Sequence, residues 1–194
     1  LNNADFVSAE IKGMPDLSVV DFIMQKVGLE PYRFMSGGFL AFNLNSVAEY
    51  FLNYYNEDWI WLFMHKPKAK LVKHGEVYQL PYDPFENAVE KALHQEFGEI
   101  LVEGFKEMGA RNDFSLLIDN TFWQIILKKC KNNLIKLKEI CKNKEFEVGV
   151  NVCSALLYYY QNLNSSSFVR VFNQYLIKKT SWLDLIENGG VENV

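Results

Sequence analysis

The segment DPFENAVEKALHQEFGEILVEGFKEMG, residues 83–109, determines the fold that this sequence predicts. Apolar residues recur in it every three or four positions, which is the spacing of a single buried stripe on an α-helix. The carboxylate of Asp83 can accept hydrogen bonds from backbone N–H groups of the first helical turn, and Pro84 is favoured at the first helical position. Gly109 can adopt the left-handed conformation that ends many helices. We therefore predict a long helix over these residues as the hub of the fold, with Phe97 and Leu101 buried.

The chain before Pro81 mixes helix and strand patterns. Helices are predicted over Asp16–Val27 and from Asn45 or Ser46 through Tyr55. Short apolar runs without helical spacing predict strands. Two such runs are Phe39–Phe42 and Trp59–Met64. Strands are also predicted over Ala69–Lys73 and Glu76–Leu80, where Val72 and Val77 flank a hairpin tip at His74-Gly75. Leu1–Gly13 has a weaker pattern, typical of a short arm or an edge strand.

After Pro81 every pattern is helical. Capping residues and apolar stripes predict helices from Asn112 or Asp113, from Asn120-Thr121, over Val148–Leu163 and over Phe168–Ile186. The expected class is α+β, with a small antiparallel sheet and two helices in residues 1–80. An all-helical lobe in residues 81–194 follows, and the two lobes are expected to form one continuous globular unit.

The amino-acid composition makes some classes of protein function less favoured than others. The net charge of −4 over 194 residues argues against a dedicated nucleic-acid binder, which needs clustered positive charge. The three cysteines form no CxxC motif and are typical of reduced thiols, so a cytoplasmic location is expected. Polar residues interrupt the uncharged stretch Val148–Val169, so no membrane span is expected. The sequence contains no motif for a metal or another cofactor, and none is expected.

Acidic residues form a row on the predicted central helix, where Glu96, Glu99, Glu103 and Glu107 stand three or four positions apart. A solvated helix face is the simplest interpretation of such a row. Because like charges at this spacing weaken a helix, the alternative is that the row faces a basic partner. The lysines between residues 128 and 144 of this chain are one candidate for that partner.

Aromatic residues gather in two clusters, one with Trp59 and Trp61 and one with Tyr158, Tyr159 and Tyr160. Three consecutive tyrosines span roughly 300° of a helix at about 100° per residue, so they cannot all face one core. Some are therefore exposed or contact a partner, and Tyr and Trp are favoured at protein interfaces. Packing between neighbouring helices is an equally good interpretation.

A non-enzymatic protein-binding module is the leading functional hypothesis, because no catalytic signature accompanies the surplus of aromatic and acidic residues. Its concrete form is an acidic inhibitor, an immunity-type protein or an adaptor that binds a basic protein by charge complementarity. A homo-oligomer is also compatible with the sequence. The candidate contact residues are Trp59, Trp61, Tyr158, Tyr159, Tyr160, Glu96, Glu99 and Glu103.

Two alternatives stay open. The first is a small-molecule-binding protein or enzyme, with a pocket between the sheet and the central helix that is lined by His65, Tyr78, Tyr82 and His94. The second is a single-stranded nucleic-acid accessory protein that uses the lysines of residues 66–74 beside two tryptophans. An edge strand that lysines protect from aggregation explains the same basic residues more simply.

Overall fold

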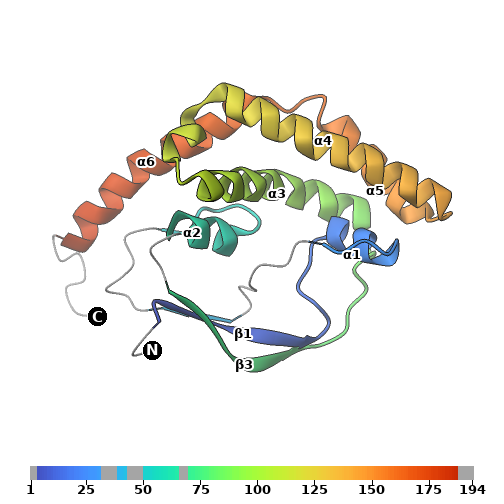
Figure 1. Ribbon diagram of the computed structural model, residues 1–194, viewed down its shortest axis with the longest axis horizontal. Helices are drawn as coiled ribbons and strands as arrows, with labels where there is room; N and C mark the ends of the chain where they lie inside the picture. The colour runs from blue at the N-terminus through green and yellow to red at the C-terminus, as the bar shows by residue number, and fades with distance from the viewer. Residues whose placement is uncertain (1–3, 32–38, 43–49, 66–69, 188–194) are drawn as a thin grey trace.

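The computed structural model of the chain describes residues 4–31, 39–42, 50–65 and 70–187. Its elements form successive layers (Figure 1). A small sheet is covered by α1 (Val19–Lys26) and α2 (Glu57–His65), and α3 (Ala88–Arg111) lies on these two helices. Three helices, α4 (Asn120–Asn143), α5 (Glu147–Tyr159) and α6 (Ser165–Glu187), cover the opposite side of α3. The predicted α+β class is confirmed.

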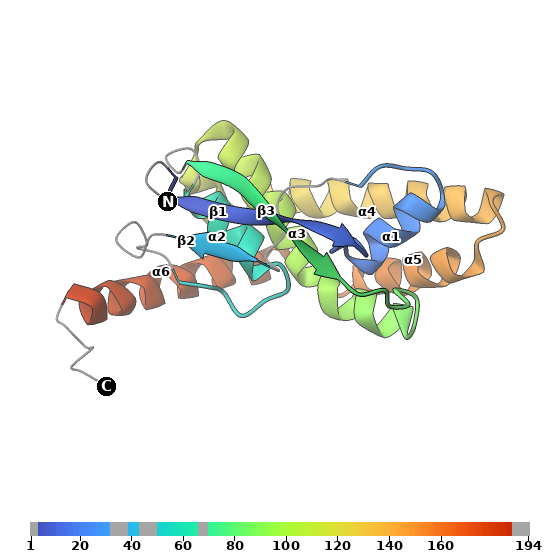
Figure 2. The same cartoon turned by 90° about the horizontal axis from the view of Figure 1, so that it is seen from below.

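The sheet has the strand order β2-β1-β3, with β1 at Phe6–Gly13, β2 at Leu40–Phe42 and β3 at Leu71–Gln79 (Figure 2). β1 pairs antiparallel with β2 and parallel with β3. The sheet is therefore mixed, and not antiparallel as predicted. The N-terminal segment, expected as an arm or an edge strand, supplies the central strand. Parallel pairing needs a long crossover connection, which no local pattern reveals.

The hairpin predicted at residues 74–75 does not form, because β3 runs through this position as one strand. Ser8 and Glu10 of β1 pair with Lys73 and Glu76 of β3, so β3 carries one residue more than β1 between these pairs. Gly75 adopts a φ of 80°, which the extra residue requires. The turn-forming glycine thus makes a β-bulge in a continuous strand.

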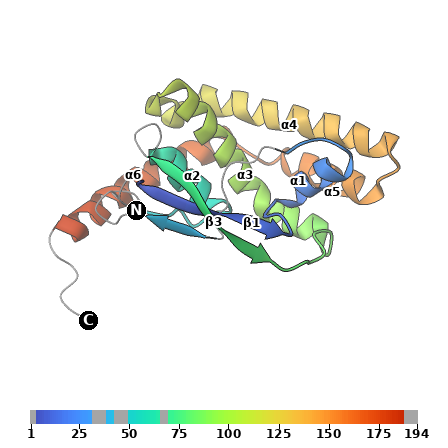
Figure 3. The same ribbon diagram turned by 60° about the horizontal axis from the view of Figure 1, so that its bottom comes forward.

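The apolar run Trp59–Met64, predicted as a buried strand, is the main part of α2. Trp61 is fully buried, with its ring centroid 5.0 Å from that of Phe6 and 4.9 Å from that of Phe42. A helix that is apolar on all sides is stable where every side is covered. Here the sheet covers one side of α2 and α3 covers the other (Figure 3). The helix therefore needs no polar face, and its sequence can be apolar throughout.

The predicted hub helix is confirmed as α3. Leu101 is 1% exposed, and Phe97 is partly buried with its ring stacked on Phe168 at a centroid distance of 4.6 Å. α3 contacts α1, α2, α4 and α5. Packing of its apolar stripe therefore joins the layers on either side.

The ends of α3 differ from the prediction. Asp83 accepts a hydrogen bond from the backbone N–H of Phe85 at 2.9 Å, but this bond closes a turn that precedes the helix. Asn87 has a left-handed φ of 53°, so regular helix begins only after it. At the other end the chain passes through Gly109 in helical conformation, and Asn112, with a φ of 51°, ends α3. Asparagine is the residue that most readily replaces glycine in this conformation.

The C-terminal helices follow the predicted order. The first is a short 3-10 helix, η2 (Phe114–Ile118), and α4, α5 and α6 follow it. Of the helix predicted from Asn45 or Ser46 to Tyr55, residues 43–49 lie outside the described residues, and residues 50–55 are not helical. Among the helices of the described residues, none combines the length and the hydropathy that a membrane span needs.

Candidate functional site

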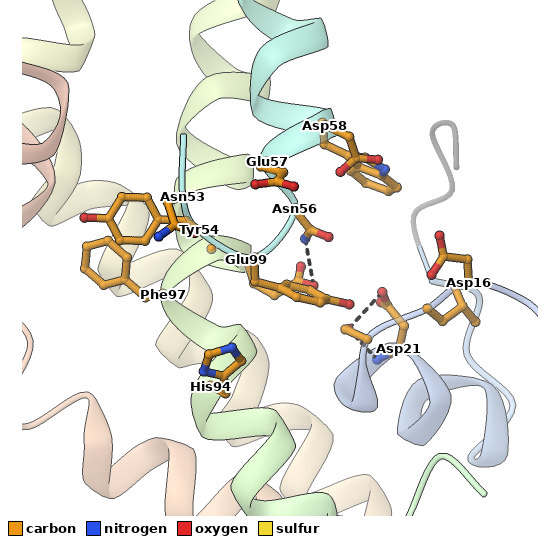
Figure 4. A pocket seen from close by; sticks show the side chains of 15 residues that line it. Asp16, Asp21, Asn53, Tyr54, Asn56, Glu57, Asp58, His94, Phe97 and Glu99 are labelled. Carbon is orange, nitrogen blue, oxygen red and sulfur yellow. Dashed lines mark hydrogen bonds between the residues drawn. The ribbon is translucent and has the colours of Figure 1, made fainter. Parts of the chain in front are cut away.

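A cavity of about 700 Å³ lies where the start of α1, the turn before α2 and the middle of α3 meet. Its walls carry five carboxyl groups, from Asp16, Asp21, Glu57, Asp58 and Glu99 (Figure 4). Among its described lining residues there is no lysine or arginine, and His94 is exposed at its margin. We call this cavity the acidic pocket.

Helix starts place most of these acidic side chains. Ser18 caps α1 by accepting a hydrogen bond from the Asp21 backbone N–H at 3.2 Å, and its hydroxyl donates to Asp21 Oδ2 at 3.0 Å. Glu57 and Asp58 stand in the first turn of α2, where the positive end of the helix dipole favours acidic residues. The position of each of these acidic residues is therefore explained by its own helix start. Their convergence on one cavity comes from the packing of α1 and α2 on α3.

Glu99 lies at the centre of the acidic pocket (Figure 4). Asn56, held at a φ of 60°, donates from Nδ2 to Glu99 Oε1 at 3.0 Å. Burial, with repulsion from Asp21 as a smaller cause, raises the pKa of Glu99 to about 8. Burial also raises the pKa of Asp58 to about 6. A cation that entered the pocket would stabilise the ionised form of both carboxyl groups.

Aromatic rings form the rest of the wall. Tyr54 is exposed and lies beside Phe97, with 5.2 Å between the ring centroids, and Trp59 is half-buried at the start of α2. Ring faces attract ammonium and guanidinium groups. The pocket thus combines negative charge with aromatic surface, a pairing suited to a lysine or arginine side chain.

The acidic row of α3 does not form one solvated face. Glu96 is 5% exposed and accepts a hydrogen bond from the Tyr160 hydroxyl at 2.6 Å. Glu103 accepts hydrogen bonds from Lys129 Nζ at 2.8 Å and from Lys106 Nζ at 3.3 Å. The solvated-face interpretation is therefore wrong for Glu96 and Glu103. The predicted pairing with the lysines of residues 128–144 is confirmed for Glu103.

The aromatic residues predicted to contact a partner differ widely in their exposure to solvent. Tyr158 is 68% exposed, Tyr159 is half-buried and Tyr160 is 7% exposed, which confirms that three consecutive tyrosines do not share one core. Trp59 borders the acidic pocket. Trp61 fills the core, so its side chain offers no surface to a partner.

The residues predicted to line a pocket between the sheet and the central helix do not converge. α2 and its buried side chains occupy that space. His94 borders the acidic pocket, while Tyr78 is exposed on β3 and Tyr82 is exposed beside Phe22. His65 is the last residue of α2.

Sequence reasoning missed Asp16, Asp21, Glu57 and Asp58 as site residues. The available signal was the placement of acidic residues at predicted helix starts, but this pattern occurs at many helix starts without any site. Three segments supply these acids and Glu99, and only the tertiary structure shows that they share one cavity.

Among the described residues, no group of three or more His, Cys, Asp or Glu side chains is arranged to hold a metal ion. Comparison of the chain with protein-family models, with curated proteins and with solved structures gives no match. A functional proposal therefore depends on the geometry and the chemistry of the site itself.

Proposed function

We propose that this chain is a non-enzymatic recognition protein that binds a basic protein partner and takes a lysine or arginine side chain of that partner into the acidic pocket. The observation that carries the proposal is the convergence of five carboxyl groups on one cavity whose described walls contain no lysine or arginine. Like charges gathered in a concave wall focus the electric field and attract the opposite charge. Complementary charge also raises association rates and excludes acidic competitors.

The aromatic walls support a side chain as the ligand. Tyr54, Trp59 and Phe97 offer ring faces for the cationic group and apolar surface for the methylene stem that precedes it. The volume of about 700 Å³ exceeds what one side chain fills. Neighbouring residues of the partner would therefore contact the rim, where Tyr54 is exposed.

The nucleic-acid alternative has less support. Trp61, one of the two predicted stacking residues, is buried. Lys66 and Lys68 lie outside the described residues. The carboxyl groups around Trp59 would repel a phosphate backbone, so its ring is poorly placed to stack on a base.

The test removes three of the five carboxyl groups of the pocket by substitutions of similar shape. The variant Asp16→Asn, Glu57→Gln, Asp58→Asn is compared with a control, Glu139→Gln, Glu145→Gln, Glu147→Gln, which removes the same formal charge from exposed positions on α4 and α5 and in the turn between them. Binding of a hexa-arginine peptide is measured by titration calorimetry, at about 20 mM and about 200 mM salt, because salt screens exposed charges. Circular dichroism verifies that both variants fold.

We expect the pocket variant to weaken peptide binding at least about tenfold and the control to change it less than about threefold, with weaker binding of the wild type at the higher salt. An equal loss in the two variants would attribute binding to net charge and would refute the pocket. A pull-down with the same three proteins then extends the test to natural partners. A protein held by the wild type and the control but released by the pocket variant would support the proposal.

A further inference from the structure

A second cavity, of about 580 Å³, lies between α1, α3 and α4. Its walls are mainly apolar, and they include Val20, Met24, Leu134, Leu137 and Ile140. We call it the α1–α4 cavity. It shares Ser18, Asp21, Trp59 and Glu99 with the acidic pocket but also reaches residues of α4, which do not line the acidic pocket.

Glu96 is the most buried carboxyl group among the described residues that line the α1–α4 cavity. Glu96 is 5% exposed and lines the cavity. Oε1 accepts the hydrogen bond of Tyr160, whereas no described residue donates to Oε2. Among the described residues, Tyr175 Oη is the only fully enclosed side-chain polar atom without a hydrogen-bond partner, so Glu96 Oε2 is still accessible, from the cavity that Glu96 lines. A ligand with an N–H group would supply the missing donor.

The protein's own cations do not fill this role. Lys136 is exposed at the edge of the cavity, and no ion pair joins it to Glu96 among the described residues. Lys129 and Lys106 are engaged by Glu103. The wall near Glu96 therefore stays acidic, since Glu99 also lines the cavity.

We infer that the α1–α4 cavity binds a small amphipathic amine, whose protonated nitrogen donates to Glu96 Oε2 and whose hydrocarbon body lies against the apolar side chains of α1 and α4. An anion of the same shape would be repelled by Glu96 and Glu99. A neutral analogue would gain the apolar contacts but not the charge-assisted hydrogen bond, which is about twice as strong as a neutral one. The inference does not rest on the proposed binding of a basic protein, although the two cavities share four lining residues, and it extends the chain's function to a small molecule.

At about pH 8 the charge states of the groups around the cavity favour a protonated amine. Burial raises the pKa of Glu96 to about 7, so its carboxyl group is mostly ionised there. Burial raises the pKa of Glu99 to about 8 and that of Cys130 to about 12. The pKa of Tyr160 is raised as well, first by burial and then by Glu96, so the tyrosine and the thiol stay neutral. Glu96 is thus a buried anion at this pH, and Asp21, Glu30 and Glu103 add further carboxyl groups to the walls of the cavity.

The test uses the full chain and three probes of matched shape: 2-phenylethylamine, 2-phenylethanol and 3-phenylpropionate. Affinities are measured by titration calorimetry at about pH 8, and methyl NMR shifts of Met24 and Leu137 report where the probe lies. Glu96→Gln removes the charge and keeps the shape. Met24→Trp fills the cavity and keeps the charge. Asp58→Asn changes only the acidic pocket.

We expect the amine to bind at least about tenfold more tightly than the alcohol or the carboxylate, and to lose that advantage in both Glu96→Gln and Met24→Trp. Asp58→Asn should change the amine affinity less than about twofold, which separates this site from the acidic pocket. Equal binding of amine and alcohol, or wild-type affinity in Glu96→Gln, would overturn the inference. Methyl shifts confined to other parts of the chain would do the same.

Discussion

At the scale of single residues, burial decides what the acidic residues of α3 can do. Glu96 and Glu103 come from one evenly spaced row, but Glu96 is enclosed beside Tyr160 and Glu103 pairs with two lysines. Burial raises the pKa of Glu96, whereas the lysines hold the pKa of Glu103 below its usual value despite its own burial. The spacing of the row is visible in the sequence, but these opposite environments depend on helices that follow later in the chain.

The substitution Glu96→Gln should stabilise the protein at about pH 8. The raised pKa means that the folded protein holds a proton on Glu96 between its usual pKa of 4.5 and about 7, where the unfolded chain has released it. The stability that protonation supplies is therefore present below pH 4.5 and is lost as pH rises through about 7. Glutamine avoids that loss and still accepts the Tyr160 hydrogen bond. We expect a gain of about 1–3 kcal/mol in urea unfolding.

The matched measurement at about pH 5 shows whether ionisation is the cause. There the wild-type carboxyl group is protonated in the folded protein, so the two proteins should differ by less than about 1 kcal/mol. A gain of the same size at both pH values would mean that packing, rather than charge, explains the effect.

Gly98 should tolerate no side chain, because a Cβ atom there would collide with the backbone carbonyl of Tyr55. That carbonyl belongs to the turn that carries Asn56 into the acidic pocket. We expect Gly98→Ala to cost about 2 kcal/mol or more in thermal or chemical unfolding. Gly109→Ala is the control on the same helix, where the nearest atom is 3.9 Å away, and a gain of up to about 1 kcal/mol is expected. Similar values for the two variants would contradict the close packing at Gly98.

At the scale of elements, neighbours decide between strand and helix where the sequence is ambiguous. The run Trp59–Met64 is apolar throughout, a pattern that suits a buried strand or a fully covered helix equally well. This segment forms a helix because the sheet and α3 cover α2 on both sides. In α3 and α4, by contrast, more than twenty residues of helical pattern leave little ambiguity, and both helices were predicted correctly as elements.

The two halves of α6 should differ in their importance for stability. The first half packs on the core, where Phe168 is fully buried and stacks on Phe97 and Trp123. The second half extends away from the other helices (Figures 1 and 3), and Ile177 is 70% exposed. We expect Phe168→Ala to cost about 3–5 kcal/mol and Ile177→Ala less than about 0.5 kcal/mol in urea unfolding. A large loss for Ile177→Ala would show that another surface covers this half in solution.

At the scale of the whole molecule, three carboxyl groups that are buried or partly buried should make the protein less stable as pH rises. The pKa values of Asp58, Glu96 and Glu99 are raised to about 6, 7 and 8, mainly by burial. The folded protein thus holds more protons than the unfolded chain, so stability falls from about pH 5 to about pH 8.5. We expect a decrease of at least about 2 kcal/mol in the free energy of unfolding. A flat profile over this range would contradict the burial of these groups.

The sequence by itself determined the long helices, the central position of α3 and the α+β class, because apolar spacing and capping act within one segment. Tertiary structure alone decided the parallel pairing of β1 with β3, since these strands lie far apart in the chain. It also decided the acidic pocket, whose five carboxyl groups come from three separate segments. The physical reason is the same in both cases: charge and strand pairing act through space, and the distances are set only when α1 and α2 pack against α3.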